Sequence, residues 1–156
     1  MQDNAVIVFL RAPQTGRVKT RLAQQLDQGL VLELYRAFVL DTLETARALG
    51  RPYIFYTPPD QEELIGEWLG TGYDDAVQRD GEIGERVADA FLTLFKNGAK
   101  RCVLIGTDIP QLEKDHLKQA VQMLSIKDAV LGPSQDGGYY LIGFNRDSFS
   151  SAVFDN

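Results

Sequence analysis

The sequence predicts a single α/β domain, with three α/β/α layers and a mostly parallel central sheet. Segments typical of strands alternate with segments of helical periodicity along almost the whole chain, which is the pattern of strand–helix–strand units. Several strand segments are apolar nearly throughout, as parallel strands are when helices cover both faces of the sheet. With 156 residues and 44% hydrophobic composition, the chain is long enough to bury one core, and it shows no linker or internal repeat.

In the first half of the chain, the expected elements alternate regularly. They are a strand over 4–10, the beginning of a helix at 21–26, an amphipathic helix over 31–49, a strand over 52–57, a short helix ending at 69 and a weak strand over 73–78. The amphipathic helix is predicted from apolar residues spaced three and four apart, and Gly50 is expected to end it. The strand over 52–57 is rich in aromatic and β-branched residues, and Pro58 and Pro59 stop it.

The second half continues the alternation. Its expected elements are a helix entered at 79–86, a strand over 101–106, a helix over 113–124, a strand over 128–131 and a strand over 139–144. The strand over 101–106 is the clearest interior strand of the sequence. The two glycines after Asp136 either allow a close backbone approach or form a hairpin-like turn. Residues beyond 144 are polar and show no pattern.

Three turns of the predicted fold should lie at one edge of the sheet. In a parallel sheet with right-handed crossovers, every strand-to-helix turn falls at the carboxyl edge, which is where such sheets bind ligands. The turn after the first strand, the turn over 79–86 and Thr107-Asp108 are all of this kind. We therefore expect their side chains to meet in one site.

The turn after the first strand, residues 11–21, is basic although the whole chain carries a formal net charge of −6. The cations of this basic turn are Arg11, Arg17, Lys19 and Arg21. Pro13 and Gly16 mark the turn itself, because proline presets φ and glycine accepts positive φ. Cations gathered in this way suit the binding of phosphate, and the alternative is a solvated basic loop.

Asp108 follows an apolar strand and lies two residues before Pro110, so its backbone position is well defined. Its carboxylate suits Mg²⁺ or Mn²⁺, because such ions take one or two carboxylates together with substrate phosphates. Cations on one side and a metal-binding carboxylate on the other would hold a diphosphate and stabilise its departure. The alternative is an aspartate that caps the following helix.

Composition and motifs exclude or disfavour other kinds of site. A single cysteine, Cys102, rules out an intrachain disulfide and a four-cysteine zinc site, and the lone His116 has no evident partner for a triad. The residues after the first strand match neither a P-loop nor a dinucleotide fingerprint. The acidic balance argues against a general nucleic-acid binder. The absence of a signal peptide or a long apolar run predicts a cytoplasmic protein with no membrane span.

Four segments, in this order, resemble one known family. They are residues 8–23 around the basic turn, Gly84-Glu85-Arg86, residues 105–110 and residues 132–143. These motifs are similar to those of the bacterial glycosyltransferase-A-like family of nucleotide-diphospho-sugar transferases. Members are related in fold to phospholactate guanylyltransferase and to molybdenum-cofactor nucleotidyltransferases. The resemblance covers nearly the whole chain and implies one nucleotide-diphospho-sugar transferase-like domain over residues 1–156.

The resemblance assigns a role to each matching residue. It implies that the phosphates of a nucleotide are held by Arg11, Gly16, Lys19 and Arg21, that the base or ribose lies near Gln78, Gly81 and Arg86, and that the acceptor site is bordered by Asp136, Gly137 and Gly138. Asp108 stands in for the metal-binding aspartate of the family's Asp-x-Asp motif. Lys19 and Asp108 are the expected catalytic residues, with Mg²⁺ or Mn²⁺ as the cofactor.

The implied activity is metal-dependent transfer from a nucleoside-diphosphate sugar to a small-molecule acceptor. Two alternatives stay open at this point. A nucleotidyltransferase acting on a nucleoside triphosphate and a phosphorylated acceptor would use the same phosphate site, and a non-catalytic nucleotide-binding protein would need no second carboxylate. The chain departs from the family in two ways: the segment Thr107-Asp108-Ile109-Pro110 has one carboxylate instead of two, and the usual C-terminal elements are expected to be missing.

Overall fold

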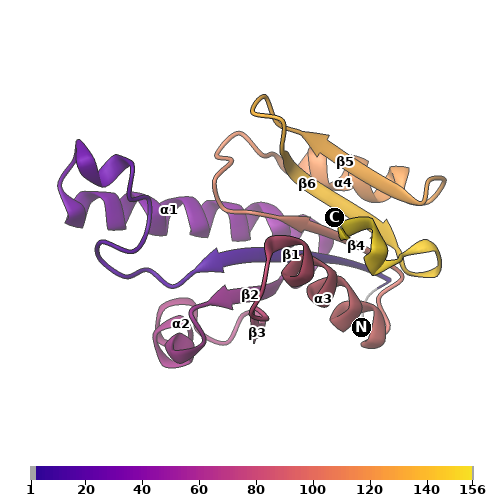
Figure 1. Cartoon of the computed structure of the whole chain (residues 1–156), viewed down its shortest axis with the longest axis horizontal. Helices are drawn as coiled ribbons and strands as arrows, with labels where there is room; N and C mark the ends of the chain where they lie inside the picture. The colour runs from indigo at the N-terminus through magenta and orange to yellow at the C-terminus, as the bar shows by residue number, and fades with distance from the viewer. Residues whose placement is uncertain (1–2, 156) are drawn as a thin grey trace.

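The computed structural model describes residues 3–155, and these form a six-stranded sheet with helices on both faces (Figure 1). The strands are β1 (Asn4–Arg11), β2 (Tyr53–Thr57), β3 (Asp74–Val77), β4 (Arg101–Ile105), β5 (Ala129–Pro133) and β6 (Tyr139–Asn145). The helices are α1 (Gln28–Ala46), α2 (Glu62–Leu69), α3 (Ile83–Lys96) and α4 (Lys114–Met123), and short 3-10 turns lie at Leu22–Gln24, Arg47–Leu49, Pro59–Gln61, Arg146–Ser148 and Ser151–Phe154. The predicted three-layer α/β fold is confirmed.

The strand order β3-β2-β1-β4-β6-β5 places β1 and β4 in the middle of the sheet. β1 pairs in parallel with β2 on one side and with β4 on the other, so that Val8 lies opposite both Ile54 and Ile105. From β1 the chain proceeds outward through β2 and β3, and it then crosses back to form β4. The strand order therefore reverses between β1 and β4, and ligands of open α/β sheets bind outside the carboxyl ends of strands at such a point.

Each face of the sheet has its own core, because alternate residues of a strand point to opposite faces. On one face, Val8 and Tyr56 belong to a core formed with α1, α2 and α4. On the other face, Ile7 and Phe55 pack with the apolar stripe of α3. Both faces of β1 are thus covered, which explains why its sequence is apolar nearly throughout. No helix within residues 3–155 has the length and apolarity needed to cross a membrane.

The hairpin of β5 and β6 departs from the parallel arrangement. β6 runs antiparallel to both β4 and β5, and the turn between the hairpin strands is closed by a hydrogen bond from the Ser134 N–H to the Gly138 carbonyl, at 2.9 Å. Gly137 has φ +88°, which glycine adopts without strain. The connection is far too short for the crossover that parallel strands need, so the strands must be antiparallel. Of the two interpretations of the glycines after Asp136, the hairpin-like turn is therefore correct.

The expectation that residues beyond 144 lack a pattern misses an aromatic cluster beneath α3. Phe149 lies with its ring centroid 5.5 Å from that of Phe91 and 5.1 Å from that of Phe144, and Phe154 packs on the same core. A Cβ atom at Gly84 would lie 3.0 Å from the Cβ atom of Phe154. Gly84 therefore allows the C-terminal segment to lie close against the start of α3, which accounts for one residue of the Gly84-Glu85-Arg86 motif.

Cys102 is buried in β4, and burial raises the pKa of its thiol from the ordinary 9.0 to about 12. Because the thiolate is the reactive form, we expect the native protein to react with Ellman's reagent at pH 8 at least a thousandfold more slowly, roughly, than the urea-unfolded chain. Above pH 9 the unfolded chain loses the thiol proton while the folded chain keeps it, so stability should fall between pH 9 and about 12.

The urea midpoint at pH 8 and at pH 10.5 or so measures this loss of stability. The variant Cys102→Ala serves as the control, because it should show a smaller fall over the same range. The burial of the thiol would be contradicted if the native protein reacted as fast as the unfolded chain.

Candidate functional site

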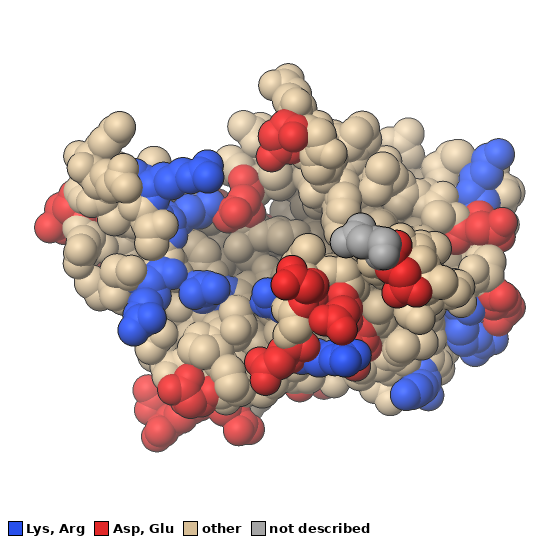
Figure 2. All heavy atoms as spheres, in the orientation of Figure 1, with Lys and Arg blue, Asp and Glu red and all other residues tan. Residues whose placement is uncertain are grey.

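A cavity of about 740 Å³ lies at the carboxyl ends of β1, β2, β3 and β4, at the reversal of strand order. We call it the basic cavity, because five of the six charged side chains that line it are cations: Arg11, Arg17, Lys19, Arg21 and Arg86, with Asp108 as the acid. Figure 2 shows Lys and Arg side chains gathered around a hollow in this face of the molecule. In an acidic chain, such a concentration of positive charge favours an anionic ligand.

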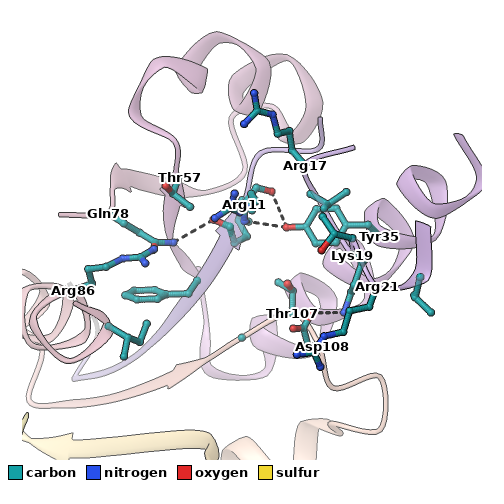
Figure 3. A pocket seen from close by; sticks show the side chains of 17 residues that line it. Arg11, Arg17, Lys19, Arg21, Tyr35, Thr57, Gln78, Arg86, Thr107 and Asp108 are labelled. Carbon is teal, nitrogen blue, oxygen red and sulfur yellow. Dashed lines mark hydrogen bonds and ion pairs between the residues drawn. The ribbon is translucent and has the colours of Figure 1, made fainter. Parts of the chain in front are cut away.

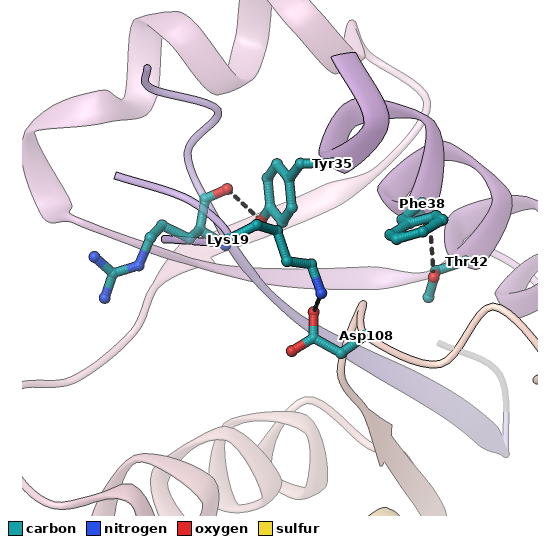
Figure 4. Close-up of polar contacts among 6 residues, drawn as sticks. Lys19, Tyr35, Phe38, Thr42 and Asp108 are labelled. Carbon is teal, nitrogen blue, oxygen red and sulfur yellow. Dashed lines mark hydrogen bonds and ion pairs between the residues drawn. The ribbon is translucent and has the colours of Figure 1, made fainter. Parts of the chain in front are cut away.

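Lys19 and Asp108 meet at one end of the basic cavity, although 89 residues separate them in the chain. The Lys19 Nζ atom lies 2.5 Å from Oδ1 of Asp108, and it also lies 5.6 Å from the centroid of the Phe38 ring on α1 (Figure 4). The Lys19 side chain is 20% exposed and that of Asp108 is 70% exposed. Because the Asp108 carboxylate is largely open to water, this ion pair contributes little stability, so phosphate or a metal ion can displace either partner at small cost.

The backbone at Lys19 has φ +47°, a left-handed conformation that is uncommon outside glycine. Buried Val18 anchors the loop just before it. The Lys19 carbonyl accepts hydrogen bonds from Leu22 N at 2.9 Å and Ala23 N at 3.2 Å, so Lys19 begins the 3-10 turn Leu22–Gln24. Strained backbone of this kind gathers at functional sites. Here it lies within the basic turn, and the side chain of Lys19 reaches Asp108.

Tyr35 of α1 ties the basic turn to the helix layer. Its hydroxyl donates a hydrogen bond to the Arg11 carbonyl at 2.7 Å and accepts one from the Arg11 N–H at 2.9 Å. Burial raises the pKa of Tyr35, and the charge of Asp108 adds to the shift. In the sequence, Tyr35 lies at one position of the apolar helical stripe, and helical spacing alone predicts a core residue there. Its hydroxyl holds the end of β1 where the cavity opens.

The opposite end of the basic cavity is formed by Gln78 and Arg86 (Figure 3). Gln78 follows β3 and is buried, whereas Arg86 extends from the first turn of α3. The Gln78 Nε2 group donates hydrogen bonds to the carbonyls of Leu10, at 3.2 Å, and Phe55, at 2.8 Å. The Gln78 Oε1 atom accepts a hydrogen bond from Arg86 Nη2. One buried side chain thus joins β1, β2 and α3.

Some residues that the resemblance assigned to the site lie elsewhere. Gly16, Gly81, Asp136, Gly137 and Gly138 are not among the residues that line the basic cavity. Gly16 and Gly81 both have positive φ, and a Cβ atom at Gly81 would meet the Glu85 carboxylate at 2.2 Å. These two glycines shape the loops that carry the cations. The phosphate role of Gly16 and the ribose role of Gly81 remain predictions.

Asp136 is engaged within the β5–β6 turn. Its carboxylate accepts hydrogen bonds from the Ser134 hydroxyl and, at 3.1 Å, from the Gly138 N–H. The bond from Ser134 is the main cause of a lowered pKa of the Asp136 carboxyl. This geometry stabilises the hairpin turn, and the acceptor role of residues 136–138 remains a prediction.

The cavity also has apolar walls that the sequence patterns did not indicate. Phe9 at the end of β1, Leu22 after the basic turn and Ile83 at the start of α3 line it, and both Leu22 and Ile83 are exposed. Apolar residues at element ends are normally interpreted as core or as incidental surface. Their place beside the cations makes the cavity suitable for a ligand with an anionic end and a flat or apolar end.

The residues present fit a divalent metal only together with a ligand. Within residues 3–155, no group of three His, Cys, Asp or Glu side chains is placed to hold a metal ion. Asp108 supplies one exposed carboxylate at the cavity. Mg²⁺ is commonly bound by one or two carboxylates, with substrate phosphates and water completing its shell. The donor set at Asp108 therefore suits such an ion when a polyphosphate is bound beside it.

Residues 39–156 match the model of the protein family DUF2064, which is described as an uncharacterized protein conserved in bacteria. The chain belongs to the DUF2064 family. The matched segment of this DUF2064 chain includes Gln78, Arg86 and Asp108, and the basic turn precedes it. A comparison with curated proteins found no match.

Solved structures extend the comparison over the whole DUF2064 chain. A candidate nucleotide-diphospho-sugar transferase from Desulfovibrio desulfuricans G20 is 39% identical, with a TM-score of 0.94 over 100% of this chain and 69% of that one. A cytidylyltransferase from Leptospira borgpetersenii is 15% identical, with a TM-score of 0.58 over 94% and 62% of the two chains. Rv0371c from Mycobacterium tuberculosis H37Rv, in complex with manganese, is 16% identical, with a TM-score of 0.59 over 99% and 73%. The last two show a shared fold alone, and the first confirms the predicted resemblance.

Proposed function

We propose that this protein is a metal-dependent transferase that uses a nucleoside-diphosphate sugar as its donor. The observation that carries the proposal is the basic cavity itself, with five cations and one acid at the carboxyl edge of the sheet. The name of the relative that is 39% identical supports a nucleotide-sugar donor. The name of the 15% identical structure supports nucleotidyl transfer as the alternative.

In this proposal the cations of the basic turn bind the diphosphate. Arg11 and Arg21 line the cavity with Lys19, and charge-assisted hydrogen bonds from them to phosphate oxygens are stronger than neutral ones. They also stabilise the negative charge that develops on the departing nucleoside diphosphate in the transition state. When bound at Asp108, Mg²⁺ or Mn²⁺ supplies further neutralisation of the diphosphate.

Nucleotidyl transfer is the second candidate, and the charge of the cavity favours it specifically. A nucleoside triphosphate carries more negative charge than a nucleoside-diphosphate sugar, and five cations against one carboxylate match it well. The two reactions leave different products. Release of sugar and nucleoside diphosphate from a nucleotide sugar supports the first candidate, and release of pyrophosphate from a triphosphate with a phosphorylated acceptor supports the second.

A thermal-shift screen of nucleotides and nucleotide sugars, with and without Mn²⁺, tests the proposal before any acceptor is known. A ligand that binds the native state raises the apparent melting temperature. Nucleotides that shift the protein are then assayed for the two sets of products. The proposal fails if no nucleotide or nucleotide sugar raises the melting temperature under either condition.

Lys19→Ala tests the phosphate site. The variant should bind a nucleoside diphosphate about tenfold or more weakly than the parent, because a charge-assisted hydrogen bond to phosphate is lost. Affinity for the corresponding nucleoside should change much less, and isothermal titration calorimetry measures both. Lys118→Ala, which removes a lysine of α4 that is paired with Asp115, is the matched control. Equal weakening of the diphosphate and the nucleoside would contradict a phosphate role for Lys19.

A further inference from the structure

Gln78 donates both of its amide hydrogens to groups inside the protein. Its side chain is 6% exposed, and both hydrogens of Nε2 are directed to carbonyls, those of Leu10 and Phe55. The Gln78 Oε1 atom accepts from Arg86 Nη2. A primary amide has only two hydrogens to donate, so Gln78 has none left for a ligand. For Gln78 to donate a hydrogen bond to the base or ribose, which the resemblance placed near it, a bond to a strand carbonyl would have to break.

The guanidinium of Arg86 is held by its hydrogen bond to Gln78, but that bond leaves its positive charge unbalanced. It lies in the first turn of α3, where the helix dipole disfavours a cation, and it is half-buried against the basic cavity. Among residues 3–155 no carboxylate forms an ion pair with it, whereas its neighbour Arg79 pairs with Glu85 at 3.9 Å. An anion that enters the cavity would supply the counter-charge that no ion pair within residues 3–155 gives Arg86.

From these two observations we propose that Gln78 is a positioning residue that fixes the Arg86 guanidinium at the cavity wall, where Arg86 binds an anionic oxygen of the substrate. The proposal rests on the proposed function, because it takes a nucleotide or nucleotide sugar as the ligand. Of the five N–H donors of the guanidinium, Gln78 engages one, and the planar shape then directs the others.

The bond from Gln78 has a consequence for affinity. A long arginine side chain normally loses rotational freedom when it binds a ligand. Arg86 has already lost much of it, because Oε1 of Gln78 holds one edge of the guanidinium, and Gln78 is itself fixed by two strand carbonyls. The relative positions of β1, β2 and α3 therefore determine where the Arg86 guanidinium lies.

A double-mutant cycle tests this coupling. The variants are Gln78→Met, Arg86→Met and the pair, with Arg79→Met as the control for a cation that does not line the cavity. Affinities for ATP, GTP, CTP and UTP, each with Mn²⁺, are measured by calorimetry, and the tightest of the four is followed through the cycle. We expect each single variant at positions 78 and 86 to weaken binding about tenfold or more, the pair to be no weaker than Arg86→Met alone, and Arg79→Met to be unchanged.

The outcomes separate the positioning role from the proposed function. If the parent binds a nucleotide tightly and the two losses add, Gln78 does not act through Arg86 and the inference is wrong. If the parent binds none of the four nucleotides, the inference is wrong, whereas the proposed function fails only if the thermal-shift screen also finds no nucleotide or nucleotide sugar that binds. A purely structural role of Gln78 predicts equal losses of affinity whether or not Arg86 is present.

A second measurement guards against misfolding of Gln78→Met. In the parent without ligand, the Arg86 Nε–H signal in a nitrogen-15 NMR spectrum should show an immobilised guanidinium, and it should shift when the nucleotide is added. The Arg79 signal, from a more exposed side chain, should do neither. An Arg86 signal as mobile as that of Arg79 overturns the inference regardless of how the variants fold.

Discussion

Asp108→Asn is expected to lower the turnover of the proposed transferase by about a hundredfold or more, and to remove the tightening of nucleotide binding by Mn²⁺. The carboxylate is the one acid among the residues that line the basic cavity. An amide of the same shape keeps the local packing but loses the negative charge that attracts a divalent ion. The measurements are initial rates with the nucleotide found by screening, and calorimetric titrations with and without Mn²⁺.

Asp115→Asn is the matched control for this prediction. Asp115 lies in the first turn of α4, is highly exposed and pairs with Lys118 at 3.7 Å, so it has the same chemistry away from the cavity. Its variant should keep the parent's rate and metal response. The metal proposal is wrong if Mn²⁺ does not tighten nucleotide binding in the parent, or if Asp108→Asn leaves the tightening intact.

Phe91→Ala is expected to have the largest effect on stability, about 3–5 kcal/mol, through the loss of buried contacts and the cavity that remains. Phe91 is 0% exposed, and its ring lies 5.1 Å from that of Phe144, edge to face, and 5.5 Å from that of Phe149. It therefore joins α3, β6 and the C-terminal segment in one cluster. Urea unfolding measures the free energy of unfolding of the parent and the variant.

Leu92→Ala provides the comparison on the same helix. Leu92 follows Phe91 in α3 but is 38% exposed, so its truncation should cost no more than about 1 kcal/mol. Because small domains are stable by only about 5–15 kcal/mol, Phe91→Ala should populate the unfolded state measurably in mild urea. Equal losses in the two variants would contradict the packing described for the cluster.

The alternation of strands and helices was predictable because both patterns are local. Apolar residues at helical spacing indicate a helix with one buried face, and a continuous apolar run indicates a strand that is buried on both faces. These two patterns located every strand and α-helix to within a few residues. The antiparallel direction of β6 was within reach as well, since the short segment over 134–138 leaves no room for a crossover. Phe149 and Phe154 were missed because two isolated aromatic residues make no periodic pattern.

The candidate site was predictable only in outline. The position of Lys19 and of Asp108 after parallel strands implied a shared edge of the sheet, and the structure places their side chains 2.5 Å apart. By contrast, nothing near Tyr35 in the sequence indicates that its hydroxyl binds the backbone of Arg11. The amide of Gln78 was assigned to a ligand by resemblance, whereas the structure commits it to two strands and to Arg86.

The sequence by itself therefore determined the order of strands and helices, the concentration of cations after β1 and the single acid after β4, because these depend on local residue type and spacing. Only the tertiary structure decided which of those groups touch, and which cation is held in place without a counter-charge. Contacts across 24, 68 or 89 residues depend on strand register and on the direction of each side chain. Those are set when the helices pack on the sheet, and no local pattern encodes them.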